Sequence, residues 1–172
     1  ASWASYRSQD LARVLRPDDV ILLHGGGNFG DLYLHNQAVV RMEVLREFSR
    51  HRTLQLPQSI WFQDEKNRVT LASLCEAHRD FTLLVRDRQS LDLARAHFRV
   101  PSELCPDMAF ALGPLNRIRP ARRDILWLAR TDVESCGGHA PVDQADVEVV
   151  DWLSPLPDDE PWPLFSRFHA HL

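Results

Sequence analysis

The chain has 172 residues, 44% hydrophobic and 26% charged, which is an ordinary composition for a soluble globular protein. This length is enough for one well-buried domain and short for two. The net charge of −4 gives no bulk attraction to nucleic acid, so an anion site must be built locally. No apolar run approaches the roughly 18 residues of a membrane span, and the N-terminus lacks a signal-peptide pattern. We therefore expect a cytoplasmic protein, with association at the inner face of the membrane left open.

The N-terminal part of the chain predicts a helix, a strand and a glycine turn. Residues 5–16 have helical apolar spacing, and the apolar run 20–23 predicts a strand buried on both faces of a sheet. Gly25, Gly26 and Gly27 follow, and their missing Cβ atoms let a ligand approach the backbone N–H groups. We expect this turn to lie at a helix N-terminus, where the helix dipole favours an anion. The alternative is a tight strand-to-helix turn without a ligand.

Helices and strands continue to alternate after the glycines. The next helix has Leu34, Ala38, Met42 and Leu45 on its apolar side, with Arg41 placed elsewhere. Further strands are predicted at 53–56, where Pro57 stops the run, at 81–85 and within 99–107, and a helix is predicted at 66–78. Asp87 is expected to cap the helix that follows the strand 81–85.

This alternation predicts an α/β fold, a doubly wound Rossmann-like parallel sheet. A proline- and arginine-rich stretch separates it from two more predicted strands, at 124–131 and 147–153. The second domain is expected to be incomplete or shortened. The predicted parts are a Rossmann-like domain at 1–112, a linker at 113–123 and the start of a second α/β domain at 124–172.

Polar side chains follow the predicted strands at the carboxyl edge of the sheet, where ligands bind in open α/β folds. Gln58 and Ser59 follow one strand, and this pair either contacts a ligand or satisfies its own turn. Arg86 and Arg88 follow the next strand, and guanidinium groups suit carboxylate and phosphate ligands. The alternative for the arginines is solvated surface. The histidines show no HxxxH or HExxH spacing and the three cysteines form no CxxC pair, so no metal site is expected.

The blocks His24–Tyr33, Leu56–Phe62, Val85–Ser90 and Cys105–Phe110, in this order, resemble the polysaccharide pyruvyl transferase family. The resemblance implies the N-terminal half of a two-domain fold like that of glycosyltransferase-B enzymes. It implies phosphoenolpyruvate as the donor and a sugar of a cell-surface polysaccharide, or of its lipid-linked precursor, as the acceptor, with a pyruvate ketal as the product.

The family's Arg-Leu-His element resembles the C-terminal Arg167-Phe168-His169, and the alternative is an unstructured tail. On this resemblance Arg167 and His169 are catalytic, with His169 as the general acid. Asp31 is expected either to accept a proton from a sugar hydroxyl or to cap its helix.

No cofactor besides the co-substrate phosphoenolpyruvate is expected. His24 and His35 are further candidates for the acid, and the alternative for both is a structural role. Two alternatives remain open, a glycosyltransferase that uses a nucleotide sugar and a truncated, non-catalytic binding protein. The residues expected to bind the donor are Gly25, Gly26, Gly27, Asn28, Gln58, Arg86 and Arg88.

Overall fold

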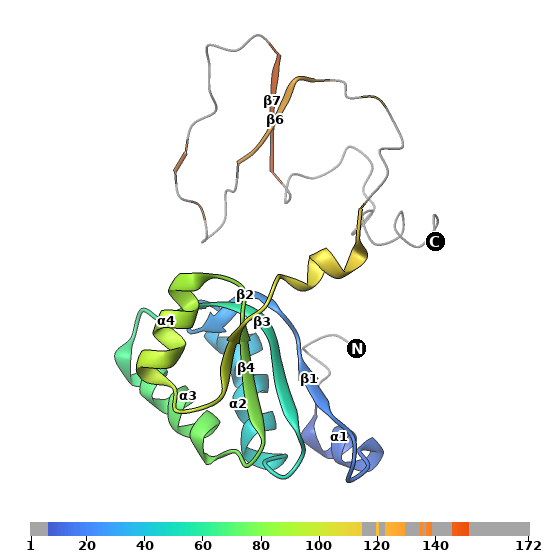
Figure 1. Ribbon diagram of the computed structural model, residues 1–172, viewed down its shortest axis with the longest axis vertical. Coiled ribbons are helices and arrows are strands. Elements are labelled where there is room, and N and C mark those ends of the chain that lie inside the picture. Colours follow the sequence, from blue (N-terminus) through green and yellow to red (C-terminus); the bar gives the residue numbers. More distant parts are fainter. Residues whose placement is uncertain are drawn as a thin grey trace. The chain divides into compact units, whose positions relative to one another are not determined.

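The computed structural model describes residues 7–114, 120, 123–129, 135, 137–138 and 146–151. The chain divides into two compact units, Ala1–Leu115 and Asn116–Leu172, and each is described by itself. Helices and strands alternate in the first unit (Figure 1). Its elements are α1 (Ser8–Val14), β1 (Ile21–Leu23), β2 (Gly26–Gly30), the π-helical turn η2 (Leu34–Ala38), α2 (Val39–Glu47), β3 (Thr53–Trp61), α3 (Glu65–Ala77), β4 (Phe81–Val85), α4 (Arg88–His97), β5 (Ser102–Leu104) and the 3₁₀ turn η3 (Met108–Leu112).

The strands of the first unit form one parallel sheet in the order β1, β3, β4, β5. Strand β2 also pairs with β3, further along the same edge as β1, so β1 and β2 are two parts of one interrupted edge strand. The predicted α/β class with a Rossmann-like parallel sheet is confirmed. Within the described strands the order advances in one direction only, without a reversal.

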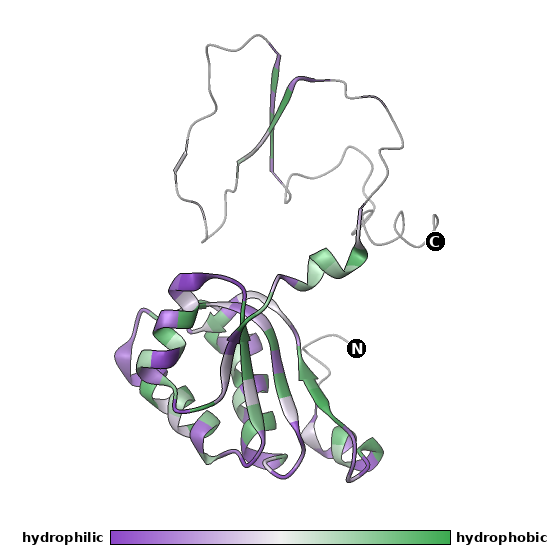
Figure 2. Ribbon diagram, in the orientation of Figure 1, coloured by the Kyte–Doolittle hydropathy of each residue, from purple (hydrophilic) through white to green (hydrophobic). Residues whose placement is uncertain are grey.

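This strand order places the helices on one face of the sheet. Right-handed crossovers that all step in the same direction leave their helices on the same side, and Figure 1 shows α2, α3 and α4 gathered there. One core cluster joins Leu45 of α2, Cys75 of α3 and Ala94 of α4 to Leu83 of β4. In Figure 2 the strands β1 and β4 are largely hydrophobic, whereas α3 and α4 alternate between the two colours.

The opposite face of the sheet is less covered, which corrects one expectation. The strand at 20–23 was expected to be buried on both faces, but Leu22 is 60% exposed. Ile21, its neighbour, is buried against Val44 and Phe48 of the α2 region. The reason is that no described helix crosses to the side on which Leu22 lies.

Pro57 does not stop its strand, contrary to the sequence-based expectation. Strand β3 continues to Trp61. The pairing of β3 with β4 shifts between Gln55 and Gln58, and the edge pairing jumps from Leu23–Gln55 to Gly26–Gln58. Pro57, which has no N–H to donate, therefore lies where both ladders are already irregular, and this position tolerates proline.

Several local predictions are confirmed. Strand β4 has the predicted bounds, and Cys75 is fully buried on its helix. Asp87 is the N-cap of α4, because its Oδ1 accepts a 2.7 Å hydrogen bond from the N–H of Ser90. None of the helices in the described ranges is long and apolar enough to cross a membrane.

In the second unit, β6 (Ile125–Leu128) pairs with β7 (Val147–Val150) in parallel. Arg123 forms ion pairs with Asp146 at 2.8 Å and Glu148 at 3.7 Å, next to this pair of strands. The strands predicted near 124–131 and 147–153 are thus present in the described residues. The extent of the second domain stays a prediction.

Candidate functional site

Residues Gly25–Gly30, the glycine segment, are part of the sheet rather than a strand-to-helix turn. A Cβ on Gly25 would lie 2.8 Å from the carbonyl oxygen of Pro57, so this glycine allows the edge strand to approach β3 closely. Gly26 has φ +124°, which few other residues adopt. A Cβ on Gly30 would overlap the backbone of Trp61. Close packing between backbones therefore requires glycine at positions 25 and 30, and the positive φ favours it at position 26.

The predicted helix N-terminus at the glycine triplet is wrong. Gly26–Gly30 is β2, and helical structure begins only at Leu34, as a π-helical turn that leads into α2. Strand pairing prevails because Phe29 is fully buried in the core and pairs with Ile60 of β3. The N–H groups and dipole of that helix therefore do not point at Gly25–Gly27.

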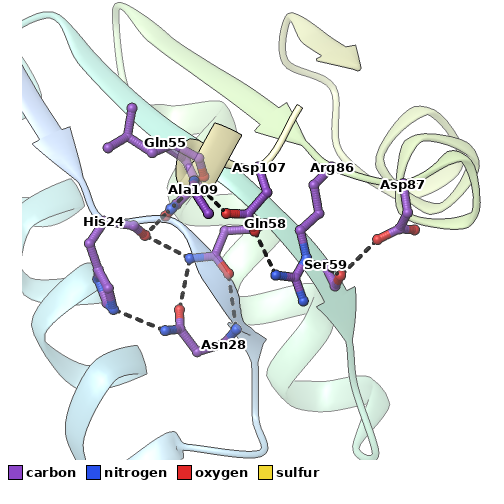
Figure 3. Close-up of polar contacts among 10 residues, drawn as sticks. His24, Asn28, Gln55, Gln58, Ser59, Arg86, Asp87, Asp107 and Ala109 are labelled. Atoms are coloured by element: carbon purple, nitrogen blue, oxygen red, sulfur yellow. Dashed lines mark hydrogen bonds and ion pairs between the residues drawn. The ribbon is translucent and has the colours of Figure 1, made fainter. Parts of the chain in front are cut away.

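A polar network, buried except for the exposed His24, bridges the break between β1 and β2; its members are His24, Asn28, Arg41, Gln55 and Gln58 (Figure 3, which labels all of these except Arg41). The amide of Gln58 donates to the carbonyl of His24 at 2.6 Å and to Oδ1 of Asn28 at 2.8 Å. Its Oε1 accepts from the backbone N–H of Asn28 at 2.9 Å. Gln55 donates to the carbonyl of His24 at 2.8 Å. These amides replace the ladder bonds that the interruption removes.

Arg41 completes the network from α2. It is 2% exposed, and its guanidinium donates to Oε1 of Gln55 at 2.7 Å, the carbonyl of Asn28 at 3.1 Å and Oδ1 of Asn28 at 2.9 Å. It also lies 5.1 Å from the ring centroid of Phe29. Burial lowers the pKa of Arg41 to about 10. The sequence analysis placed Arg41 away from the apolar side. However, Arg41 lies three positions after Ala38 and four positions before Leu45, which is the spacing of that side.

A second group of polar residues, the Arg86 cluster, consists of Gly27, Ser59, Arg86, Asp87 and Asp107 (Figure 3 labels all but Gly27). Arg86 donates from Nε to Oγ of Ser59 at 2.8 Å and from Nη1 to Oδ2 of Asp107 at 2.7 Å. Its Nη2 lies 3.2 Å from where a Cβ on Gly27 would sit. The guanidinium thus reaches the glycine segment from the end of β4, with its side chain 35% exposed.

The partners of Arg86 are themselves fixed. Ser59 donates to Oδ2 of Asp87 at 2.7 Å, and Asp87 also caps α4. Burial would raise the pKa of Asp87, but hydrogen bonds from Ser59 and Ser90 outweigh it and lower that pKa. The backbone N–H of Ala109 and the guanidinium of Arg86 lower the pKa of Asp107. Both carboxylates are therefore charged near neutral pH, and the orientation of Arg86 is well defined.

Asp31 lies beyond the end of β2 and is held by the segment before α3. Its Oδ1 accepts from the N–H of Gln63 at 2.8 Å, and its Oδ2 accepts from the N–H of Asp64 at 2.8 Å and the amide of Asn67 at 3.1 Å. Burial would raise the pKa of Asp31, but these hydrogen bonds together lower it. Asp31 does not cap a helix of its own, as one alternative predicted, because residues 31–33 form a bend and turn.

Asp31 also lines a polar pocket of about 650 Å³ together with His35, Asp64, Glu65 and Asn67. A low pKa makes its carboxylate a weak base. Its role as the base for a sugar hydroxyl stays a prediction.

The structure brings some of the predicted site residues together and not others. Gly27 and Arg86 converge, whereas the polar side-chain atoms of Asn28 and Gln58 bond within the protein, which favours the alternative that Gln58 is structural. Arg88 is exposed in the first turn of α4 and makes no hydrogen bond or ion pair with any described residue.

The predicted catalytic residues Arg167 and His169 lie outside the described residues. Sequence analysis missed Asp107 and Arg41. For Asp107 a signal existed, since it follows the last predicted strand at the same edge.

Fold and site together define a class of protein: a parallel α/β domain with an arginine at the carboxyl edge of its sheet, oriented toward a glycine segment and suited to a small anion. Comparison with known proteins identifies the family within this class. Residues 2–155 match the family model described as polysaccharide pyruvyl transferase. The chain belongs to this family.

Two of three similar proteins are named as pyruvyl transferases. Pyruvyl transferase 1 of Schizosaccharomyces pombe is 36% identical over 152 residues, which cover 83% of this chain and 38% of that protein. The putative pyruvyl transferase EpsO of Bacillus subtilis is 33% identical over 147 residues, covering 85% of this chain and 45% of that protein. General stress protein 30 of Bacillus subtilis is 30% identical over 128 residues, or 72% of this chain and 37% of that protein. The chain thus spans less than half the length of these relatives.

Proposed function

We propose that this chain takes part in transferring the pyruvyl group of phosphoenolpyruvate to a sugar of a cell-surface polysaccharide or of its lipid-linked precursor. The product would be a pyruvate ketal, and the reaction would take place in the cytoplasm or at the inner face of the membrane. Family membership supports the reaction class. The observation that carries the proposal is the guanidinium of Arg86 beside Gly27 at the carboxyl edge of the sheet.

Phosphoenolpyruvate carries a phosphate and a carboxylate, and Arg86 can bind either of them. Its Nε and Nη1 are engaged by Ser59 and Asp107, while Nη2 faces the glycine segment. An anion at Gly27 would take its hydrogen bonds from Nη2 and share Nη1 with Asp107. Arg88, exposed at the start of α4 and without a partner among the described residues, would add a second cation.

The proposed chemistry needs cations, a general acid and a base. Protonation of the methylene carbon of phosphoenolpyruvate turns it into a methyl group and leaves a cationic centre at the neighbouring carbon. One sugar hydroxyl attacks that carbon and gives its proton to the base. Phosphate then leaves, a second hydroxyl attacks the same carbon to close the ketal ring, and its proton returns to the group that acted as the acid. On the family resemblance we assign the acid to His169, with Arg167 two positions before it in the sequence. We assign the base to Asp31 because of its carboxylate and its position after the glycine segment. The assignment includes no metal ion and no further cofactor.

Asp31 provides a test of the base. If its carboxylate accepts the hydroxyl proton, Asp31→Asn leaves the affinity for phosphoenolpyruvate unchanged and strongly lowers the rate of phosphate release. Asn67→Ala, which removes only one hydrogen bond to the same carboxylate, is the matched control. A wild-type rate in Asp31→Asn would reduce Asp31 to an anchor for the segment before α3.

The donor is tested by isothermal calorimetry with phosphoenolpyruvate and, separately, with nucleotide sugars. Binding of phosphoenolpyruvate supports the proposal, and tight binding of a nucleotide sugar alone would favour a glycosyltransferase. Because the chain spans less than half of its relatives, a non-catalytic binding protein is the second outcome to separate. It would bind phosphoenolpyruvate without releasing phosphate from it in the presence of any saccharide acceptor.

A further inference from the structure

Arg41 is a buried cation without a buried anion. Its guanidinium contacts only neutral acceptors, on Gln55 and Asn28, and the ring of Phe29. No carboxylate pairs with it within the part of the chain that the structure describes. Burying an unpaired charge costs free energy, and an apolar side chain would pack there without that cost. A role in the site explains the buried arginine better than a contribution to the stability of the fold does.

Hydrogen bonds from Arg41 and from the backbone N–H of Asn28 fix the orientation of the side-chain amides in the network. An arginine can only donate, so the atoms it meets on Gln55 and Asn28 are the oxygens. The backbone N–H of Asn28 can only donate as well, so it faces Oε1 of Gln58. The Nδ2 group of Asn28 therefore points away from Arg41, and it lies 2.9 Å from Nε2 of His24.

The state of His24 follows from this orientation. Nδ2 of Asn28 is a donor, so Nε2 of His24 has to accept and cannot carry a proton. The ring is then neutral, with its proton on Nδ1. His24 directly precedes the glycine segment and is exposed, so it can reach a ligand there.

We propose that Arg41 is a positioning residue: it locks Asn28, and Asn28 in turn holds His24 as a neutral imidazole that accepts at Nε2. The permanent positive charge behind the glycine segment then belongs to the buried arginine and not to His24. As a part of the donor site this role rests on the proposed function. It also removes His24 from the candidates for a cationic general acid.

Electrostatics agree with this assignment. Partial desolvation and the charge of Arg41 lower the pKa of His24, and a hydrogen bond with the side chain of Gln37 acts in the opposite direction. Arg41 is the charged group that acts on His24 among the described residues. The imidazole is therefore expected to be neutral over a wider pH range than an ordinary histidine.

Nitrogen-15 NMR of the histidine rings tests the proposal, with His24→Gln used to assign the signals. In the wild-type chain we expect His24 to be protonated on Nδ1 and to titrate below 6.5. In Arg41→Met the titration midpoint should rise toward that value and the single tautomer should be lost. Arg41→Lys keeps the charge without the planar fork, so it should retain the low midpoint but lose the tautomer preference. Arg46→Met, an exposed site on the same helix, is the control.

A second variant keeps the test decisive if Arg41→Met does not fold. Asn28→Asp is nearly isosteric, gives Arg41 a carboxylate partner and removes the donor that faces His24. We expect His24 to become protonated on Nε2, with a raised titration midpoint. An unchanged tautomer in Asn28→Asp, or identical His24 titrations in the wild type and Arg41→Met, would overturn the proposal.

Binding of phosphoenolpyruvate separates this proposal from the proposed function. We expect at least a tenfold weaker affinity in Arg41→Met and a smaller loss in Arg41→Lys. Equal affinities in the wild type and Arg41→Met would show that Arg41 does not contribute to donor binding. Absence of binding in the wild type would refute the proposed function, while the NMR result would still decide the state of His24.

Discussion

Arg86 shows how a single exposed cation becomes part of a defined site. A free arginine side chain on a protein surface samples many rotamers, and ordering it on a ligand costs entropy. Here Ser59 and Asp107 hold two of its nitrogens before any ligand arrives, and Ser59 is itself bonded to the cap of α4. The remaining Nη2 faces Gly27, where a side chain would intrude. Because the fold already orders the Arg86 side chain, less conformational entropy is lost when a ligand binds.

Replacement of this side chain tests the donor site directly. Arg86→Ala should weaken the binding of phosphoenolpyruvate by about 1.5–3 kcal/mol, the value of a hydrogen bond to a charged group, or roughly ten- to hundredfold. Calorimetry measures the affinity, and urea unfolding shows whether the loss of the Asp107 ion pair also affects stability. Arg95→Ala, an exposed arginine in the last turn of α4, is the control. Equal affinity in the wild type and Arg86→Ala would remove Arg86 from the site.

Asp31 makes a prediction about stability and pH. Its pKa is lower in the folded protein than the ordinary value of 3.8, so its contribution is present above that value and is lost as the pH falls through the folded pKa. Asp31→Asn should therefore cost about 1–2 kcal/mol at neutral pH, and the difference from the wild type should shrink below pH 3.8. Urea unfolding between pH 2.5 and 7 measures both values. A difference that does not change with pH would contradict the assignment.

The side chains of the inner strand β4 show that the two faces of the sheet differ in burial. Phe81, Leu83 and Val85 are buried against the helices, while Thr82 and Leu84 alternate with them on the other face and are only half-buried. This pattern follows from the strand order, because successive crossovers in one direction leave the helices on one side. The second face of the described sheet is therefore apolar in part but not covered by a described helix.

Two substitutions in β4 measure this asymmetry. Leu83→Ala should lower the free energy of unfolding by about 2–5 kcal/mol, because the side chain is fully buried and leaves a cavity. Leu84→Ala, one residue along the same strand, should cost about 1 kcal/mol or less, because its side chain is only half-buried. Urea unfolding of both variants checks the pair. Equal losses would mean that both faces of the sheet are buried to the same degree in solution.

The chain has two compact units, and the residues assigned to donor binding and to acid catalysis lie in different units. Both hydrophobic clusters and the Arg86 cluster belong to the unit Ala1–Leu115. The residues assigned to acid catalysis, Arg167 and His169, belong to the other unit. Donor binding and proton transfer are thus expected to depend on different parts of the chain.

A shortened chain of residues 1–115 separates these parts. It should unfold cooperatively, because it keeps its whole core, and it should bind phosphoenolpyruvate within about threefold of the full chain, a difference of well under 1 kcal/mol. Phosphate release should be abolished, since the assigned acid is missing. Circular dichroism, calorimetry and a phosphate assay measure the three properties. Retained phosphate release would show that the acid lies within residues 1–115.

Much of the first unit could be predicted from local sequence. The apolar run Phe81–Val85, the cap at Asp87 and the apolar side of the helix that carries Cys75 all appear where the pattern placed them. Each depends on near neighbours in the chain, on periodicity or on one capping hydrogen bond. The four sequence blocks were sufficient to predict the family.

Other features were decided only by contacts between distant parts of the chain. The glycine segment is a strand because β3 lies within pairing distance and Phe29 fills the core, and Pro57 is tolerated because both neighbouring ladders are interrupted beside it. Arg41 is buried because Gln55 and Asn28, from two different strands, supply acceptors for its guanidinium. The sequence alone determined the alternation of helices and strands outside the glycine segment, the apolar sides of strand 81–85 and of the helix that carries Cys75, and the family. The tertiary structure decided which polar side chains bond to each other and which are left for a ligand, because hydrogen-bond partners far apart in sequence meet only after the sheet has formed.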